Sequence, residues 1–197
     1  MVGGFHTTGN FLTWVIYYLA IYPHMQEKVF EEIQEILGPN TELDIKSMDK
    51  LKYLNAFLSE SHRHANISSF GAREWTTPNR RIAGHLIPEG TPILLANTVA
   101  SLDEKYFPDP SKFDPACFLD EAANRKRPST AFAPFGFGPR KCMGYRFAHF
   151  ETVAAVVAVV QRFVVQTAFE DDFYIEQTHG FVCKPASEIW VKIRSRF

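Results

Sequence analysis

The stretch FGFGPRKCMG, residues 135–144, gathers side chains that could hold a reactive sulfur. Cys142 follows Arg140 and Lys141, and an apolar helix is predicted to begin directly after it. Nearby cations and the free N–H groups at the start of a helix both favour a thiolate over a thiol. The three glycines permit turns with positive φ and the close approach of a flat or bulky partner, while Phe135 can shield the sulfur from water.

The cysteine count and the charge narrow the possible roles of that sulfur. Cys117 and Cys183 complete an odd total of three with no C-x-x-C pair. This number argues against a disulfide framework and excludes a tetrahedral zinc site built only from cysteines. A net charge of −1 gives no global attraction to nucleic acid. Each cysteine is therefore a lone nucleophile, a ligand or a core residue.

The cysteine stretch resembles the haem-binding loop of the cytochrome P-450 family, F-x-x-G-x-R-x-C-x-G. All five fixed positions are filled, by Phe135, Gly138, Arg140, Cys142 and Gly144. The resemblance implies that Cys142 is the thiolate ligand of the iron of haem b. It further implies that Arg140 pairs with a haem propionate, that Phe135 and Gly138 pack around the sulfur and the porphyrin, and that Arg73 supplies a second cation.

Two more segments resemble family motifs in the family's order. Glu60-Ser61-His62-Arg63 fits E-x-x-R, and residues 109–118, DPSKFDPACF, resemble the meander that usually reads F-x-P-E-R-F. Glu60 and Arg63 would then be structural. Cys117 stands where the family has the arginine of that meander, which implies a lost donor to Glu60. The spacing His62-x-His64 separates the two rings by about 200° on a helix, which favours surface histidines over a metal site.

Residues 3–8, GGFHTT, resemble the family's oxygen-activating patch in the I helix. Thr7 would help to hold dioxygen and to steer protons. His6 stands where the family has Asp or Glu, as in orphan members with an altered motif. An imidazole can relay protons near neutral pH, so His6 is either a catalytic relay or a partly buried residue with no catalytic duty.

Periodicity and breakers predict a mainly α fold with a minor β part. Helices are expected at 3–21, 26–37, 53–64 and 145–163, with helical turns over 44–52, short strands within 68–97 and 164–197, and an irregular stretch over 101–130 that serves a site. The resemblance implies that residues 1–197 are the C-terminal portion of the cytochrome P-450 fold, from the I helix onward, without the N-terminal half and its membrane anchor.

The implied function is that of a haem-dependent monooxygenase, which inserts one oxygen atom of dioxygen into a small apolar substrate. Electrons would come from NADPH through a flavoprotein reductase, and the location would be the endoplasmic reticulum membrane. Two alternatives stay open: a haem-binding sensor or carrier without turnover, and a truncated chain without function.

Overall fold

The computed structural model describes residues 2–38, 43–68, 70–78, 80–168, 175–180 and 182–197. Four helices carry most of its ordered core: α1 (Val2–Ile21), α2 (Pro23–Leu37), α4 (Lys52–His64) and α8 (Tyr145–Val160). In α2 and α4 the inward face is apolar because hydrophobic residues recur every three or four positions. The fully buried side chains include Trp14, Val15 and Leu19 of α1, Val29 and Ile33 of α2, Leu54 and Phe57 of α4, and Val153, Val156 and Val160 of α8.

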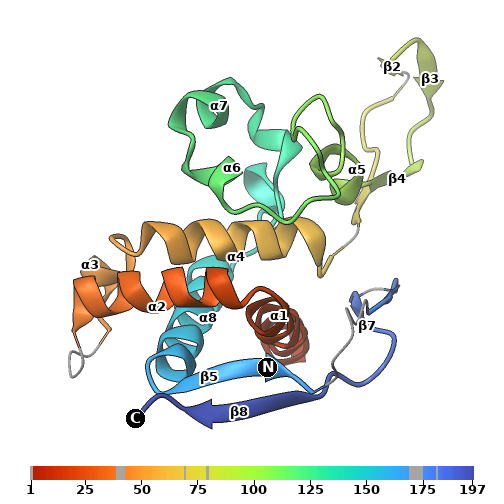
Figure 1. Ribbon diagram of the computed structural model, residues 1–197. Coiled ribbons are helices and arrows are strands. Elements are labelled where there is room, and N and C mark those ends of the chain that lie inside the picture. The colour runs from red at the N-terminus through yellow and green to blue at the C-terminus, as the bar shows by residue number, and fades with distance from the viewer. Residues whose placement is uncertain (1, 39–42, 69, 79, 169–174, 181) are drawn as a thin grey trace.

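The strands form four two-stranded antiparallel sheets within the described residues. β5 (Phe163–Thr167) pairs with β8 (Val191–Ser195) and lies against the helices, whereas β2 (Arg80–Ile82) and β3 (His85–Ile87) form a hairpin that projects away from them (Figure 1). β1 (Gly71–Glu74) pairs with β4 (Pro92–Leu95), and β6 (Gln177–Thr178) with β7 (Lys184–Pro185).

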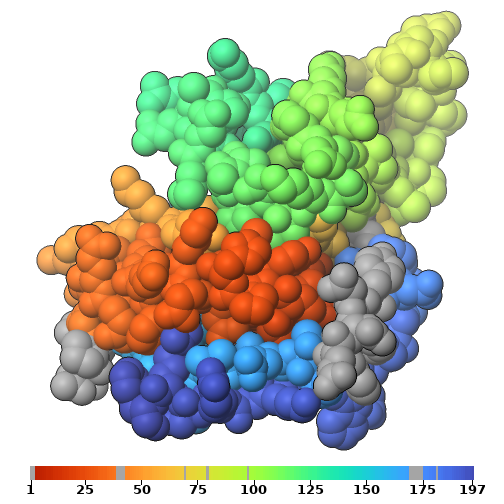
Figure 2. Space-filling model, viewed as in Figure 1, coloured from red at the N-terminus to blue at the C-terminus, as the bar shows by residue number. Residues whose placement is uncertain are grey.

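The segment between β4 and α8 is a meander of short helices that covers the side of α4 opposite β5 and β8 (Figures 1 and 2). Its elements are α5 (Asn97–Ser101), α6 (Ala116–Leu119), α7 (Glu121–Lys126), and the 3-10 turns η1 (Ser129–Ala131) and η2 (Gly138–Arg140). The small helix α3 (Ile45–Met48) lies at the N-terminal end of α4, where the Asn55 side-chain amide donates to the Met48 carbonyl at 3.0 Å (Figure 1).

The fold class and the four long helices are confirmed, and the structure differs from the prediction in two details. The helix predicted to reach residue 163 ends at Val160, because Phe163 already belongs to β5 and pairs with Ser195. Residues 101–130 contain short helices rather than purely irregular chain. Within the region 164–197, where short strands were predicted, residues 169–174 and 181 lie outside the described residues. No helix in the described part of the chain is long and apolar enough to cross a membrane.

Candidate active site

The cysteine loop is closed by one backbone hydrogen bond between its two ends. The Cys142 N–H donates to the Phe135 carbonyl at 2.9 Å. Gly136 and Gly138 adopt φ of 70° and 68°, a region that a side chain would strain. The following helix, α8, begins at Tyr145 as predicted, so the cysteine lies just ahead of its N-terminus. The loop therefore presents Cys142 at a fixed point of a tight turn, with the residue exposed.

Exposed apolar and cationic side chains surround that thiol in the sequence. Phe137 is 45% exposed, Phe147 is 69% exposed and Met143 is fully exposed. Arg140 is also exposed. An accessible sulfur with apolar neighbours and a cation suits a ligand that has an apolar body and an anionic edge.

The residues predicted for the oxygen side, His6 and Thr7, lie on α1, and the predicted second cation, Arg73, lies on β1. His6 is exposed, and Thr7 is half-buried with its hydroxyl donating to the Gly3 carbonyl at 2.6 Å. Arg73 is half-buried, and its guanidinium donates to the Ala72 carbonyl at 2.7 Å. Among the described residues, no hydrogen bond or ring contact joins these three side chains to the cysteine loop. Their roles toward a common ligand therefore stay predictions.

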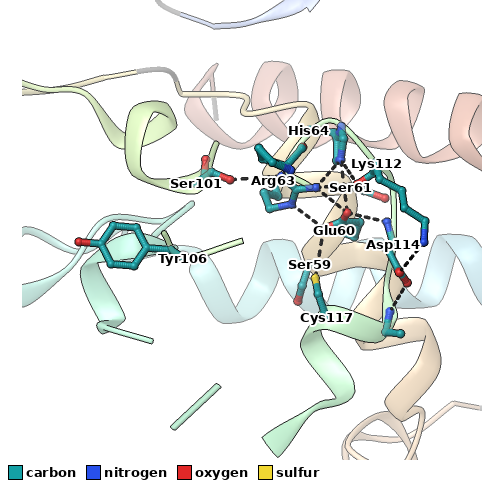
Figure 3. Close-up of polar contacts among 12 residues, drawn as sticks. Ser59, Glu60, Ser61, Arg63, His64, Ser101, Tyr106, Lys112, Asp114 and Cys117 are labelled. Atoms are coloured by element: carbon teal, nitrogen blue, oxygen red, sulfur yellow. Dashed lines mark hydrogen bonds and ion pairs between the residues drawn. The ribbon is translucent and has the colours of Figure 1, made fainter. Parts of the chain in front are cut away.

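Glu60 and Arg63 form a buried, two-point ion pair on α4. Arg63 donates from Nε and Nη2 to the two carboxylate oxygens, each at 2.7 Å. Arg63 is 2% exposed and Glu60 is fully buried. The guanidinium also donates to the carbonyls of Ser101 and Pro110, at 3.2 and 2.7 Å (Figure 3). The pair therefore ties α4 to the meander.

Cys117 occupies the position at which an arginine was expected to contact Glu60. Its thiol lies 3.6 Å from Glu60 Oε2, and the Asp114 N–H donates to Oε1 at 2.7 Å (Figure 3). Burial, reinforced by the negative charge of Glu60, raises the pKa of Cys117 to about 12. The residue is therefore a neutral thiol donor that keeps contact with the carboxylate without adding a charge.

Arg127 provides a second cation for the meander, a role that no motif in the sequence indicates. Its guanidinium donates to the carbonyls of Tyr106 and Cys117 at 3.1 and 3.4 Å. Arg127 Cζ also lies 3.9 Å from the ring centroid of Phe107. The Arg63 guanidinium lies over the same ring, with its Cζ 5.1 Å from the centroid. Arg127 therefore supports the backbone of residue 117, whose side chain contacts Glu60.

The two histidines on α4 are not the surface residues that their spacing predicted. The His62 ring is half-buried and stacks on Phe11 with a centroid separation of 3.6 Å. His64 is half-buried, with Nε2 2.6 Å from Arg63 Nη2 and 3.1 Å from the Lys112 carbonyl oxygen. One face of α4 is covered by α1 and the other by the meander. Side chains that point to opposite sides of this helix are therefore both shielded from solvent.

Two pKa shifts follow from this packing. Burial would raise the pKa of Glu60, but hydrogen bonds from Arg63, His64 and the Asp114 N–H outweigh it and lower that pKa to about 2. Burial, together with the nearby His149 of α8, lowers the pKa of His62 to about 3. The folded chain thus favours an ionised Glu60 and a neutral His62.

Comparison with known proteins gives one consistent family. The sequence model of the family "Cytochrome P450" matches residues 1–191. Similar curated proteins include cytochrome P450 2J5 of Mus musculus, 30% identical over 94% of this chain, and cytochrome P450 2C3 of Oryctolagus cuniculus, 33% identical over 93%. The chain spans only 37% and 38% of the length of these two relatives.

The Arg127→Ala variant is expected to lower the free energy of unfolding by about 1–3 kcal/mol, because the carbonyls of the meander lose a charged donor. In that background Cys117→Arg should restore stability, since a guanidinium at position 117 can reach Glu60 directly. Chemical denaturation of the four proteins of a double-mutant cycle measures the coupling. Strictly additive effects would contradict a shared role for the two positions.

The free energy of unfolding should fall as the pH drops below about 6.5. A histidine whose folded pKa is depressed stabilises the fold above its unfolded pKa of 6.5, and that contribution is lost as the pH falls towards 3. Glu60 adds a loss only below its unfolded pKa of 4.5, down to about 2. The free energy of unfolding of wild type and His62→Phe, measured by denaturation between pH 6.5 and pH 4.5, separates the contribution of His62 from that of Glu60. The variant should have the shallower slope, and equal slopes would show that His62 is not held neutral.

Proposed function

Because the chain belongs to the cytochrome P450 family, we propose that it binds haem through the sulfur of Cys142 and forms the haem-binding part of a monooxygenase. The observation that carries this proposal is the exposed thiol on a loop fixed by the Phe135–Cys142 hydrogen bond. Substrate, reductase and location are proposed from the family rather than from a feature of this site.

The residues present fit such a group by the chemistry of their donors. Cys142 offers a soft anionic ligand, which suits iron in a haem. Phe137, Met143 and Phe147 offer exposed apolar surface in the segment around it, as a porphyrin requires. Arg140 offers a cation for a propionate, and Arg73 is proposed as a second one because its strand follows the Glu60–Arg63 helix. Gly138 and Gly144 have open space where a side chain would otherwise stand.

Haem, when bound, supplies the oxygen chemistry, which inserts one atom of dioxygen into an apolar organic substrate and reduces the other to water. The chain contributes the ligand, the orientation and the proton supply. The Thr7 hydroxyl donates its hydrogen to the Gly3 carbonyl, so its oxygen can still accept a hydrogen bond from a neighbouring donor. Its backbone neighbours Gly3 and Gly4 leave open space beside the helix.

His6 takes the place of an acid next to Thr7. The imidazole is exposed, and its ring touches Phe5 edge-on at 5.3 Å. An exposed histidine can exchange a proton with solvent and pass it along α1 towards Thr7. Electrons are proposed to come from NADPH through a flavoprotein reductase at the endoplasmic reticulum membrane.

The same substitution favours a second candidate function, a haem-binding sensor or carrier without turnover. Because His6 replaces the acid of the oxygen-activating patch, dioxygen would be reduced without transfer of an oxygen atom to a substrate. The two functions share Cys142 and differ only in what Thr7 and His6 achieve.

Cys142→Ser is expected to abolish the absorption spectrum of thiolate-ligated haem in the reduced, CO-treated protein, because a hydroxyl is a poor iron ligand. Cys183→Ser is the matched control, since Cys183 is buried and donates to Gln177 instead. Absorption spectroscopy of the haem-loaded proteins measures both. An unchanged spectrum for Cys142→Ser would overturn the proposed ligand.

Thr7→Val is expected to increase severalfold the fraction of NADPH electrons that end as hydrogen peroxide, because the hydroxyl is lost while the side-chain shape is kept. The measurement is peroxide formed per NADPH consumed, by haem-loaded protein with a flavoprotein reductase. His6→Glu should lower that fraction by restoring an acid. A protein that binds haem but consumes no NADPH would instead support the carrier.

A further inference from the structure

The His62 ring lies between the helix that carries Thr7 and the loop that carries Cys142. One face stacks on Phe11 of α1, with centroids 3.6 Å apart and planes only 7° apart. Phe135 of the cysteine loop meets the same ring edge-on, at 5.1 Å and 71°. The edge-on contact with Phe135 is a favourable geometry for an aromatic pair. The contact with Phe11 places the two rings face to face. His62 therefore touches an α1 residue one helical turn beyond Thr7 and a loop residue that pairs directly with Cys142.

The position on α4 keeps this contact separate from the buried ion pair. Glu60 and Arg63 face the meander, whereas His62 faces α1. The contacts of Glu60 and Arg63 with the meander fix α4, the helix that carries the ring. Because the fold favours the neutral form of His62, the ring acts as a flat, uncharged plate between two phenylalanines.

The contact reaches the cysteine through one hydrogen bond. Phe135 accepts the Cys142 N–H at 2.9 Å, so a shift of Phe135 moves the backbone of the cysteine with it. Tyr145, at the start of α8, is a second neighbour of the same ring: its centroid lies 6.4 Å from that of Phe135, and Lys141 Nζ lies 3.7 Å from the Tyr145 centroid. Of these two supports, only His62 connects the loop to α1.

We propose that His62 is a positioning residue that fixes Phe135, and through the Phe135–Cys142 hydrogen bond the Cys142 sulfur, relative to α1. Its consequence for haem rests on the proposed function, whereas its effect on the loop does not. A single ring would thus set the spacing between the cysteine and the helix proposed to handle oxygen.

Hydrogen exchange of the Cys142 amide tests the proposal without haem. His62→Leu removes the flat ring, and the Cys142 amide should exchange about tenfold faster relative to the amides of α8. His62→Phe keeps a flat ring and should exchange like wild type. Ile33→Ala, a fully buried change on α2, is the control for lost stability alone and should leave that ratio unchanged. If His62→Leu does not fold, Phe11→Leu removes the other half of the stack.

Haem-loaded protein gives a second, independent measurement. His62→Leu should shift the haem reduction potential and increase the fraction of reduced, CO-bound protein that has lost thiolate ligation, whereas His62→Phe should do neither. A Cys142 amide ratio and a spectrum both unchanged in His62→Leu would overturn the positioning role while leaving Cys142 as ligand. If the Cys142 amide exchanges faster in His62→Leu but the wild-type protein binds no haem, the positioning role is supported and the proposed function is rejected.

Discussion

The buried Glu60–Arg63 pair is the interaction on which the arrangement of this chain depends. The segment from Leu102 to Pro115 has no long helix or strand of its own, so its backbone groups need partners from elsewhere. Arg63 supplies donors to the carbonyls of Ser101, Pro110 and Lys112, and Glu60 accepts the Asp114 N–H. Both side chains are satisfied by these contacts, which is the condition under which a buried ion pair is tolerated. The meander, and the cysteine loop after it, are placed against α4 in this way.

At position 117 a cysteine stands where the family has an arginine, and this changes the charge around Glu60. A thiol at 3.6 Å is a weaker donor than a guanidinium, but it leaves the carboxylate with one cation rather than two. Arg127 then supports the meander through backbone carbonyls and through the ring of Phe107. The meander therefore keeps a cation of its own, while the Glu60 carboxylate has, among the described residues, a single arginine as a hydrogen-bonded partner.

The sequence predicted those parts of the site that depend on local spacing. Glu60 and Arg63 are three residues apart on a helix, so their pairing follows from helix geometry, and the glycines around Cys142 predict a tight turn. It did not predict the roles of Arg127 and His62, because these depend on which elements cover them. Arg127 ends a short basic run, Asn124-Arg125-Lys126-Arg127, and such runs are usually solvated. Alternate positions on a helix likewise usually reach water. Here the meander closes over Arg127, and α1 closes over His62.

The central claim is a bond between iron and the sulfur of Cys142, on a loop held between α4 and α8. X-ray absorption at the iron edge of the haem-loaded protein measures the ligand atom directly. The account predicts one sulfur atom in the first coordination sphere of iron. A first sphere containing only nitrogen and oxygen in protein with an intact Cys142 would contradict it.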